Sequence, residues 1–224
     1  MSGNGLAVPN QGNIVLGAGD LPPIILPTGS GGGCLTSGPF KDMKVNLGPV
    51  SLDQPGGGPV GSNPNGPLAY NPRCLKRDLT NKINRDFANA TAILSNVLIP
   101  QNIDAFQMQM QGIPGSGNIG IHGGGHYALG GDPGRDFFVS PGDPAFYLHH
   151  AMIDRVWWMW QSLSPKKRTN GATAIAGTRT FMDMPPSDPA TVEDVIDLGY
   201  AGGPPKQIKE LLSTTEGPFC YIYL

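Results

Sequence analysis

The chain lacks any apolar run long enough to cross a membrane, and it lacks any block of basic residues. A membrane-spanning helix needs about 20 consecutive apolar residues, and the 224 residues contain no such run. Lysine and arginine number 15 against 17 acidic residues, so no basic surface for nucleic acid or lipid headgroups is expected. The first residues also lack the charged and then apolar pattern of a signal peptide. The length remains enough for one domain with its own core.

Cysteine is scarce, with only Cys34, Cys74 and Cys220 in the whole chain. An odd number leaves at least one cysteine without an internal partner. Either the three are ordinary buried thiols, or they belong to a disulfide-bearing secreted protein of which a piece is missing. The sequon at Asn89 is compatible with secretion, although such triplets also arise by chance.

Glycine and proline, in contrast, make up a quarter of the chain, with 33 and 23 residues. Proline removes a backbone donor, and glycine costs backbone entropy, so both oppose long helices. They are dense in residues 1–73, where there is no histidine. This opening stretch is expected to be either disordered or a long loop that lies over another part of the domain.

Helix signals begin after this stretch. Apolar residues spaced by three and four predict a helix over about 78–98, which Pro100 ends. A shorter helix is predicted over 102–111. The strongest signal covers 144–163, where Asp143 stands at the cap position and a proline occupies the first turn.

All four histidines lie between residues 122 and 150. His122 and His126 are four residues apart, so both imidazoles point the same way if the segment is helical. His150 lies in the first half of the strongest predicted helix and can supply a third nitrogen. Three neutral imidazoles with an open position suit copper or zinc.

The residues between His122 and His126 are Gly123, Gly124 and Gly125. Each glycine costs a helix about 1 kcal/mol relative to alanine. One interpretation is therefore a flexible loop with two solvated histidines. The other is a helical turn held by a metal and by packing, where the small residues allow a backbone or a substrate to approach closely.

Residues 143–158 carry a recognisable motif, which begins Asp143-Pro144-Ala145-Phe146 and contains the pair His149-His150. It resembles the second copper-binding signature of the tyrosinase (polyphenol oxidase) family. That signature is Asp-Pro-x-Phe, an aromatic residue, two residues, a ligand histidine, three residues and an aspartate. In that family the second histidine of the His-His pair binds copper, so the resemblance implies that the ligand here is His150.

The resemblance implies that His122, His126 and His150 bind one copper ion. It implies that the neighbouring His149 packs against the site without binding the metal. It also implies that Asp154 is a buried acid, either hydrogen-bonded near the site or paired with a base such as Arg155 or Arg77.

The resemblance extends over essentially the whole chain, through segments 31–49, 71–78 and 217–221, and is to the second-copper half of short fungal tyrosinases or catechol oxidases. The implied fold is mainly α: part of a type-3 copper helix bundle, with two ligand-bearing helices, long Gly/Pro-rich loops around them and little β structure. Residues 1–224 are then a partial copper-binding domain. Its parts are a connecting loop region (1–75), a helical second-copper region (76–165), and a C-terminal loop with a short helix (166–224).

A type-3 copper pair uses six histidines, three for each copper, and this chain has four. We therefore expect one copper in this chain and two in the intact family domain, with the first-copper half upstream of Met1 or on another chain. A bundle cut in half should expose apolar surface. The intact protein is expected to be a secreted oxidase that uses dioxygen to convert phenols, catechols or o-aminophenols to quinones.

Two positions bear on the substrate. Gly123 follows the first ligand, where many relatives with strong monophenol activity have asparagine. Phe137 lies near the position at which some relatives place an aromatic gate over this copper. Both features favour diphenol or o-aminophenol oxidation over tyrosine hydroxylation, unless Phe137 merely packs the loop.

Other classes of protein remain as alternatives. A type-3 copper oxygen carrier or a non-catalytic mononuclear copper fragment would share the motif. A zinc hydrolase could use the same three histidines with a bound water, but it needs a general base, and no glutamate lies between His122 and His150. A non-functional fragment is the fourth possibility.

Overall fold

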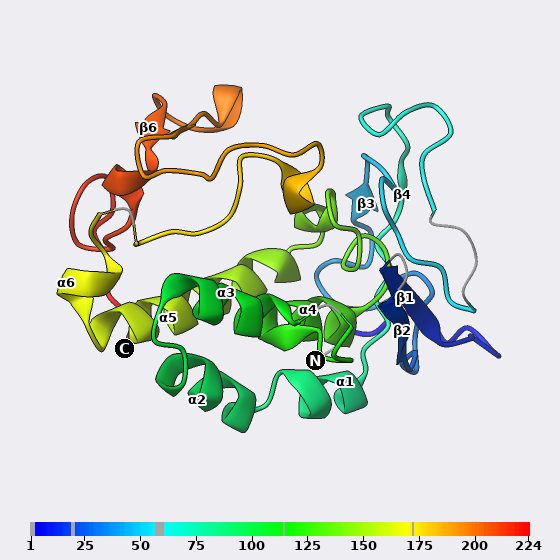
Figure 1. Cartoon of the computed structure of the whole chain (residues 1–224). Coiled ribbons are helices and arrows are strands. Elements are labelled where there is room, and N and C mark those ends of the chain that lie inside the picture. The colour runs from blue at the N-terminus through cyan, green and yellow to red at the C-terminus, as the bar shows by residue number, and fades with distance from the viewer. Residues whose placement is uncertain (1–2, 19–20, 57–60, 114, 172) are drawn as a thin grey trace. The chain divides into compact units, whose positions relative to one another are not determined.

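The computed structural model describes residues 3–18, 21–56, 61–113, 115–171 and 173–224. Most of its regular structure is helical, as Figure 1 shows, which confirms the expected mainly α fold. The helices are α1 (Asn81–Phe87), α2 (Ala90–Leu98), α3 (Ile103–Gln111), α4 (Gly120–Leu129), α5 (Ala145–Ser162) and α6 (Pro165–Arg168), with short 3-10 turns at Ser140–Gly142, Phe181–Asp183, Gly199–Ala201 and Ile208–Leu211.

The strands in the described residues form three antiparallel pairs. They are β1 (Ile14–Ala18) with β2 (Leu21–Leu26), β3 (Lys44–Val45) with β4 (Arg73–Cys74), and β5 (Val195–Ile196) with β6 (Lys206–Gln207). No helix in the described part of the chain is long and apolar enough to cross a membrane.

The chain forms two compact units. The first comprises Met1–Ile93 and Gln111–Ile153, and it contains the β1–β2 hairpin, α1, α4 and the first half of α5. The second comprises Leu94–Met110 and Asp154–Leu224, and it contains most of α3, the second half of α5 and the C-terminal segment.

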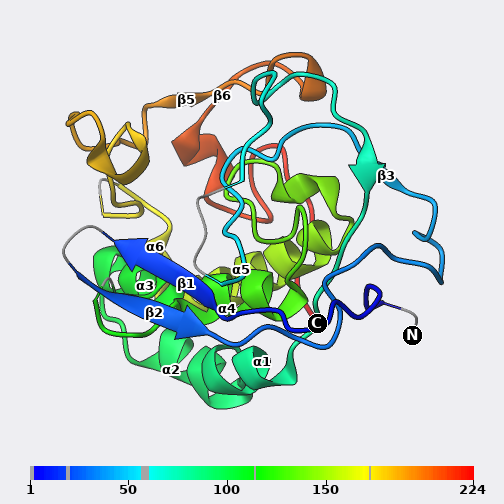
Figure 2. The same cartoon turned by 90° about the vertical axis from the view of Figure 1, so that its right-hand side faces the viewer.

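The opening stretch is more ordered than its glycine and proline content suggested. The β1–β2 hairpin pairs Ile14 with Leu26, and both side chains are almost completely buried in a cluster with Ile83, Ile119 and Tyr127. Figure 2 shows the hairpin in the same part of the structure as α1 and α4. The apolar ends of the hairpin thus supply core to the helices, which glycine and proline counts do not reveal.

One disulfide joins Cys34 to Cys74, and Cys220 is free and exposed. The interpretation of all three cysteines as buried thiols is therefore wrong. Because the bridge closes a loop of about 40 residues, it ties the glycine-rich stretch to β4, which leads into the helices.

The helix predicted over 78–98 is two helices in the structure. α1 ends at Phe87 and α2 begins at Ala90. Between them, Asn89 accepts a hydrogen bond from the backbone N–H of Ala92 at 2.9 Å and donates one to the carbonyl of Arg85 at 2.6 Å. Asparagine competes well with helical backbone bonding in this way, so it ends one helix and caps the next.

The second unit is built around Trp160, which is only 1% exposed. Its ring lies 4.7 Å from that of Phe106, and its Nε1–H donates to the carbonyl of Pro100 at 2.9 Å. The guanidinium of Arg168 covers the ring at 4.1 Å. A buried tryptophan with its N–H satisfied is a core residue.

Candidate metal centre

The segment with three consecutive glycines is helical, so the flexible-loop interpretation is wrong. α4 runs from Gly120 to Leu129. A Cβ on Gly124 would lie 2.9 Å from the Cβ of Phe87, and one on Gly125 would lie 2.1 Å from the ring of His149. The helix therefore has glycine where α1 and a histidine of α5 approach its backbone most closely. Packing compensates for the poor helix propensity.

The start of α5 is fixed by a buried ion pair. Asp143 caps the helix by accepting from the N–H of Ala145 at 2.9 Å. Both its carboxylate oxygens also accept from Arg77, at 2.8 and 2.6 Å, and Asp143 is fully buried. A bidentate pair of this kind is geometrically specific. It sets where α5 begins and thus where His150 lies.

Three histidines meet at their Nε2 atoms. The Nε2 of His126 lies 3.2 Å from that of His122 and 3.1 Å from that of His150, and the remaining pair is 3.4 Å apart. A metal bound at about 2.0–2.1 Å by imidazole nitrogens in tetrahedral directions separates them by roughly 3.3 Å. The three nitrogens therefore have the spacing that one metal ion requires.

Hydrogen bonds at Nδ1 orient two of these three rings. Nδ1 of His126 lies 2.9 Å from the carbonyl oxygen of Gly134, and Nδ1 of His122 lies 2.7 Å from Oε1 of Gln111. Since both partners are acceptors, Nδ1 carries the hydrogen, and the lone pair remains on Nε2. Metal-binding histidines usually have this arrangement. His150 is instead oriented by Phe146, whose ring stacks on it at 3.8 Å.

His149 lies against the same cluster but uses its Nε2 differently. That atom donates to the backbone carbonyl of His122 at 2.9 Å, and the two rings stack at 5.6 Å. The bond connects α5 to α4. All four histidines offer ligand atoms within 4.8 Å of one another, yet only three direct a free Nε2 lone pair to the common point.

The electrostatics of the cluster favour uncharged rings. Burial, with the neighbouring imidazoles, lowers the pKa of His122 from 6.5 to about 3 and that of His149 to about 4. Burial also lowers the pKa of His126 and of His150. The imidazoles are therefore neutral at pH 7, which is the form that binds metals.

The structure places the remaining predicted site residues as follows. Gly123 is on α4 beside His122, and the atoms nearest to a Cβ built there belong to the side chain of Ile119, at 3.2–3.8 Å. Phe137 is 63% exposed on the loop after α4. Asp154 accepts hydrogen bonds from the hydroxyls of Tyr221, at 2.8 Å, and of Tyr223.

Asp154 is thus half-buried and hydrogen-bonded, which is one of the two expected alternatives. The other alternative, a pairing with Arg77 or Arg155, is not formed. Arg77 pairs with Asp143, and Arg155 donates to the backbone carbonyl of Leu224. The two tyrosines that bind Asp154 lie nearly 70 residues further along the chain, where spacing gives no sign of the contact.

Sequence reasoning missed two contacts of the cluster, Gln111 and the carbonyl of Gly134. Gln111 ends a predicted helix eleven residues before His122, and its position there gave the only available sign. A backbone carbonyl has no sequence signal at all. A cavity of about 330 Å³ also borders the cluster, lined by His126, His149 and Phe146 together with residues of α1 and the loop after α4.

The chain is similar to known proteins in sequence and in fold. Residues 1–163 match the common central domain of tyrosinase. The chain is 37% identical over 201 residues to "Tyrosinase P" of Aspergillus terreus and 38% identical over 200 residues to N-acetyl-6-hydroxytryptophan oxidase of Emericella nidulans. These alignments cover 89% and 87% of this chain but 54% and 53% of the relatives.

Among solved structures, a glycine-to-asparagine mutant of polyphenol oxidase from Thermothelomyces thermophila is similar over the whole chain, with a TM-score of 0.86 and 45% sequence identity. The match covers 59% of that protein. The chain thus spans about half the length of the curated relatives it matches. Over the residues it has, it belongs to the tyrosinase family.

Proposed function

We propose that this chain binds one copper ion through the Nε2 atoms of His122, His126 and His150, as the second-copper part of a tyrosinase-type oxidoreductase. The observation that carries the proposal is the convergence of these three atoms within 3.4 Å. Gln111 and Gly134 hold the first two rings in the tautomer that leaves Nε2 free. Membership of the family favours copper over the zinc of a hydrolase.

Copper in such a site supplies the capacity to bind dioxygen and to accept electrons from a phenolic substrate. The residues of this chain orient the three imidazoles and keep them unprotonated. A small phenol is the proposed substrate, together with dioxygen, and a quinone is the proposed product.

We also propose that the complete site needs a first-copper half, supplied by the same polypeptide or by another chain. The twofold length of the relatives supports this. So does an apolar strip on α5 within the first unit: Tyr147, Leu148 and Met152 are 63%, 78% and 43% exposed. Exposed apolar groups on consecutive turns of one helix are typical of a surface that another element covers.

For the substrate, we propose diphenols or o-aminophenols over monophenols. Gly123 follows the first ligand and has no side chain to hydrogen-bond a substrate or a water molecule. The three atoms nearest to a Cβ built there all belong to the side chain of Ile119, at 3.2–3.8 Å. An enzyme that hydroxylates monophenols as fast as it oxidises catechols would contradict this proposal.

An oxidising compartment is proposed as the place where the protein works. The disulfide between Cys34 and Cys74 supports this, because such bridges persist mainly in secreted proteins.

Copper titration of the 224-residue chain tests the central proposal. One equivalent of copper should bind, and the electron paramagnetic resonance spectrum of the Cu(II) form should show three nitrogen ligands. His150→Ala should remove one nitrogen, whereas His149→Ala should keep all three. Unchanged binding in the His150 variant, or preferential binding of zinc over copper, would refute the assignment.

A further inference from the structure

The first half of the loop between α4 and α5 is polar and yet buried. Residues 130–136 are all buried, and they include the charged side chains Asp132, Arg135 and Asp136. The loop meets the histidine cluster through the carbonyl of Gly134, which accepts from Nδ1 of His126. The position of that carbonyl therefore sets the direction in which the imidazole points.

The loop has little freedom to move. A Cβ on Gly131 would lie 2.1 Å from the carbonyl oxygen of Lys76, and one on Gly134 would lie 2.6 Å from that of Gly130. Lys76 and Asp132 exchange two backbone hydrogen bonds, of 3.0 and 3.2 Å. The loop thus lies directly on the segment that follows β4.

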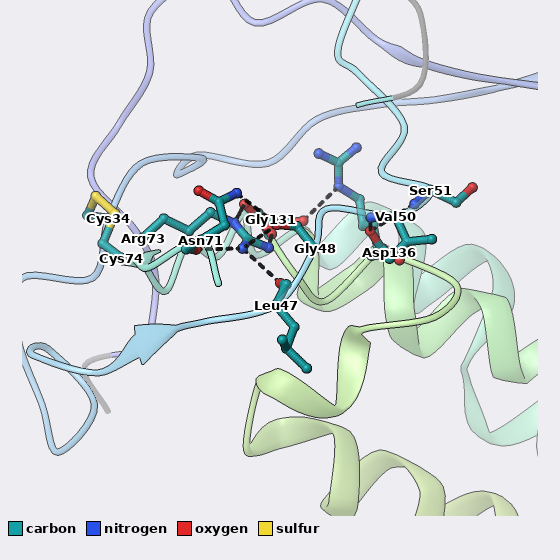
Figure 3. A network of polar contacts seen from close by, with 12 residues as sticks. Cys34, Leu47, Gly48, Val50, Ser51, Asn71, Arg73, Cys74, Gly131 and Asp136 are labelled. Carbon is teal, nitrogen blue, oxygen red and sulfur yellow. Dashed lines mark hydrogen bonds and ion pairs between the residues drawn. A yellow bond between two sulfur atoms is a disulfide. The ribbon is translucent and has the colours of Figure 1, made fainter. Parts of the chain in front are cut away.

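One ion pair connects this loop to β4. The Nε and Nη2 of Arg73 donate to the two carboxylate oxygens of Asp132, at 2.7 and 2.8 Å. The Nη1 of Arg73 donates to the carbonyls of Leu47 and Gly48, at 2.8 and 3.0 Å. Figure 3 shows the arginine reaching these carbonyls.

The backbone of Arg73 is fixed as well. Its neighbour Cys74 is bonded to Cys34, and Figure 3 shows this disulfide beside the arginine. Both members of the ion pair are largely shielded from water, with 16% of the Arg73 side chain and 8% of the Asp132 side chain exposed. Solvent therefore screens the pair only weakly.

We propose that Arg73 and Asp132 are positioning residues for His126, and that the Cys34–Cys74 disulfide holds Arg73 in place. The proposal rests on the copper-binding role of His126 given above. Neither residue touches the site. They act through the carbonyl of Gly134, two residues after Asp132. Partners that orient a ligand histidine commonly contribute 10- to 100-fold to metal affinity.

Asp132→Asn in the 224-residue chain tests the proposal. The amide nitrogen of asparagine cannot accept from Nε of Arg73, so the bidentate pair is lost. We expect about a 10- to 100-fold loss of Cu(I) affinity, measured by competition with a chromophoric chelator. The ring N–H resonance of His126 in ¹⁵N-edited NMR should also weaken or shift, with and without copper.

Arg73→Lys provides a second variant that keeps the charge but cannot form the bidentate pair, and it should give an intermediate loss. If Asp132→Asn does not fold, the copper affinity and the His126 signal of Arg73→Lys test the proposal instead. Asp86→Asn is the matched control, because it breaks an ion pair with Lys82 of the same 2.7 Å length that is exposed on α1. It should change neither copper affinity nor the His126 signal.

The outcomes distinguish a failure of the proposed copper binding from a failure of the proposed positioning role. If the parent chain does not bind copper, the proposed function is wrong, and the NMR signal of the copper-free chain still reports on the positioning role. If the parent binds copper but Asp132→Asn binds it equally well and keeps the His126 signal, the positioning role is refuted, even if the variant unfolds at a lower temperature.

Discussion

Gly125→Ala should destabilise the chain although alanine is the better helix former. A Cβ at this position would lie 2.1 Å from Cε1 of His149, far inside van der Waals contact. The ring must therefore move and release its bond to the carbonyl of His122. Overpacking costs about 1–3 kcal/mol and the lost hydrogen bond about 1 kcal/mol, against a gain of about 1 kcal/mol in helix propensity.

The net expectation is a loss of about 1–3 kcal/mol in the free energy of unfolding. Gly123→Ala is the matched control in the same helix, because the atoms nearest to its Cβ belong to the Ile119 side chain, at 3.2–3.8 Å, and none lies as close as the ring of His149 does to Gly125. The control should be neutral, or more stable by up to about 1 kcal/mol. Urea denaturation of the two copper-free variants and the parent measures both effects through their midpoints.

A third variant identifies the cause. If the clash with His149 is the reason, Gly125→Ala should cost much less in a chain that already carries His149→Ala, because the obstructing ring is gone. The coupling in this double-mutant cycle should be at least about 1 kcal/mol. Equal midpoints for the two alanine variants, or no coupling, would refute the steric explanation. The glycines would then be no more than flexible spacers between the two histidines.

Three further predictions concern the rest of the first unit. Asp143→Asn should cost about 3–5 kcal/mol in urea denaturation because it leaves the charge of Arg77 buried without its partner, and a cost below 1 kcal/mol would contradict this. Cys34→Ser should cost about 4 kcal/mol by the loop-entropy relation for 40 residues, whereas Cys220→Ser, at an exposed thiol, should leave the midpoint unchanged. The depressed pKa values of His122 and His149 mean that the unfolded chain binds more protons below pH 6.5. The copper-free protein should then lose about 1.4 kcal/mol per histidine for each unit that the pH falls from about 6 towards 4, and a flat stability profile over that range would show that the rings are not neutral in the folded state.

The sequence predicted the helix that carries His149 and His150 well, because that part of the chain carries a motif. Asp143, Phe146 and His150 each have a contact that explains their place in it: a helix cap, a stacked ring and a nitrogen in the cluster. The boundaries of α5 followed from the same residues. The helix cap and the stacked rings each join residues close together in the sequence, so they appear as a fixed spacing within the motif.

Features that depend on contacts between residues far apart in the sequence showed no recognisable spacing in it. The β1–β2 hairpin is stabilised by burying Ile14 and Leu26 against helices that lie far along the chain, so a segment rich in glycine and proline appeared to be only a loop. The partners of Asp154 are likewise remote tyrosines. In both cases tertiary packing, and not local propensity, decided the outcome.

The same distinction explains why a glycine-filled helix can carry two of the three nitrogens. Three glycines forfeit about 3 kcal/mol of helix propensity, which no exposed ten-residue helix could sustain. α4 is instead held from outside: α1 packs on Gly124, His149 packs on Gly125, and the carbonyl of Gly134 fixes the ring of His126. Larger residues would restore propensity but would push these neighbours away. The distances between the Nε2 atoms depend on how closely α5 approaches α4. The glycines that lower the helix propensity of α4 therefore also allow the Nε2 atoms of the three imidazoles to lie within 3.4 Å of one another.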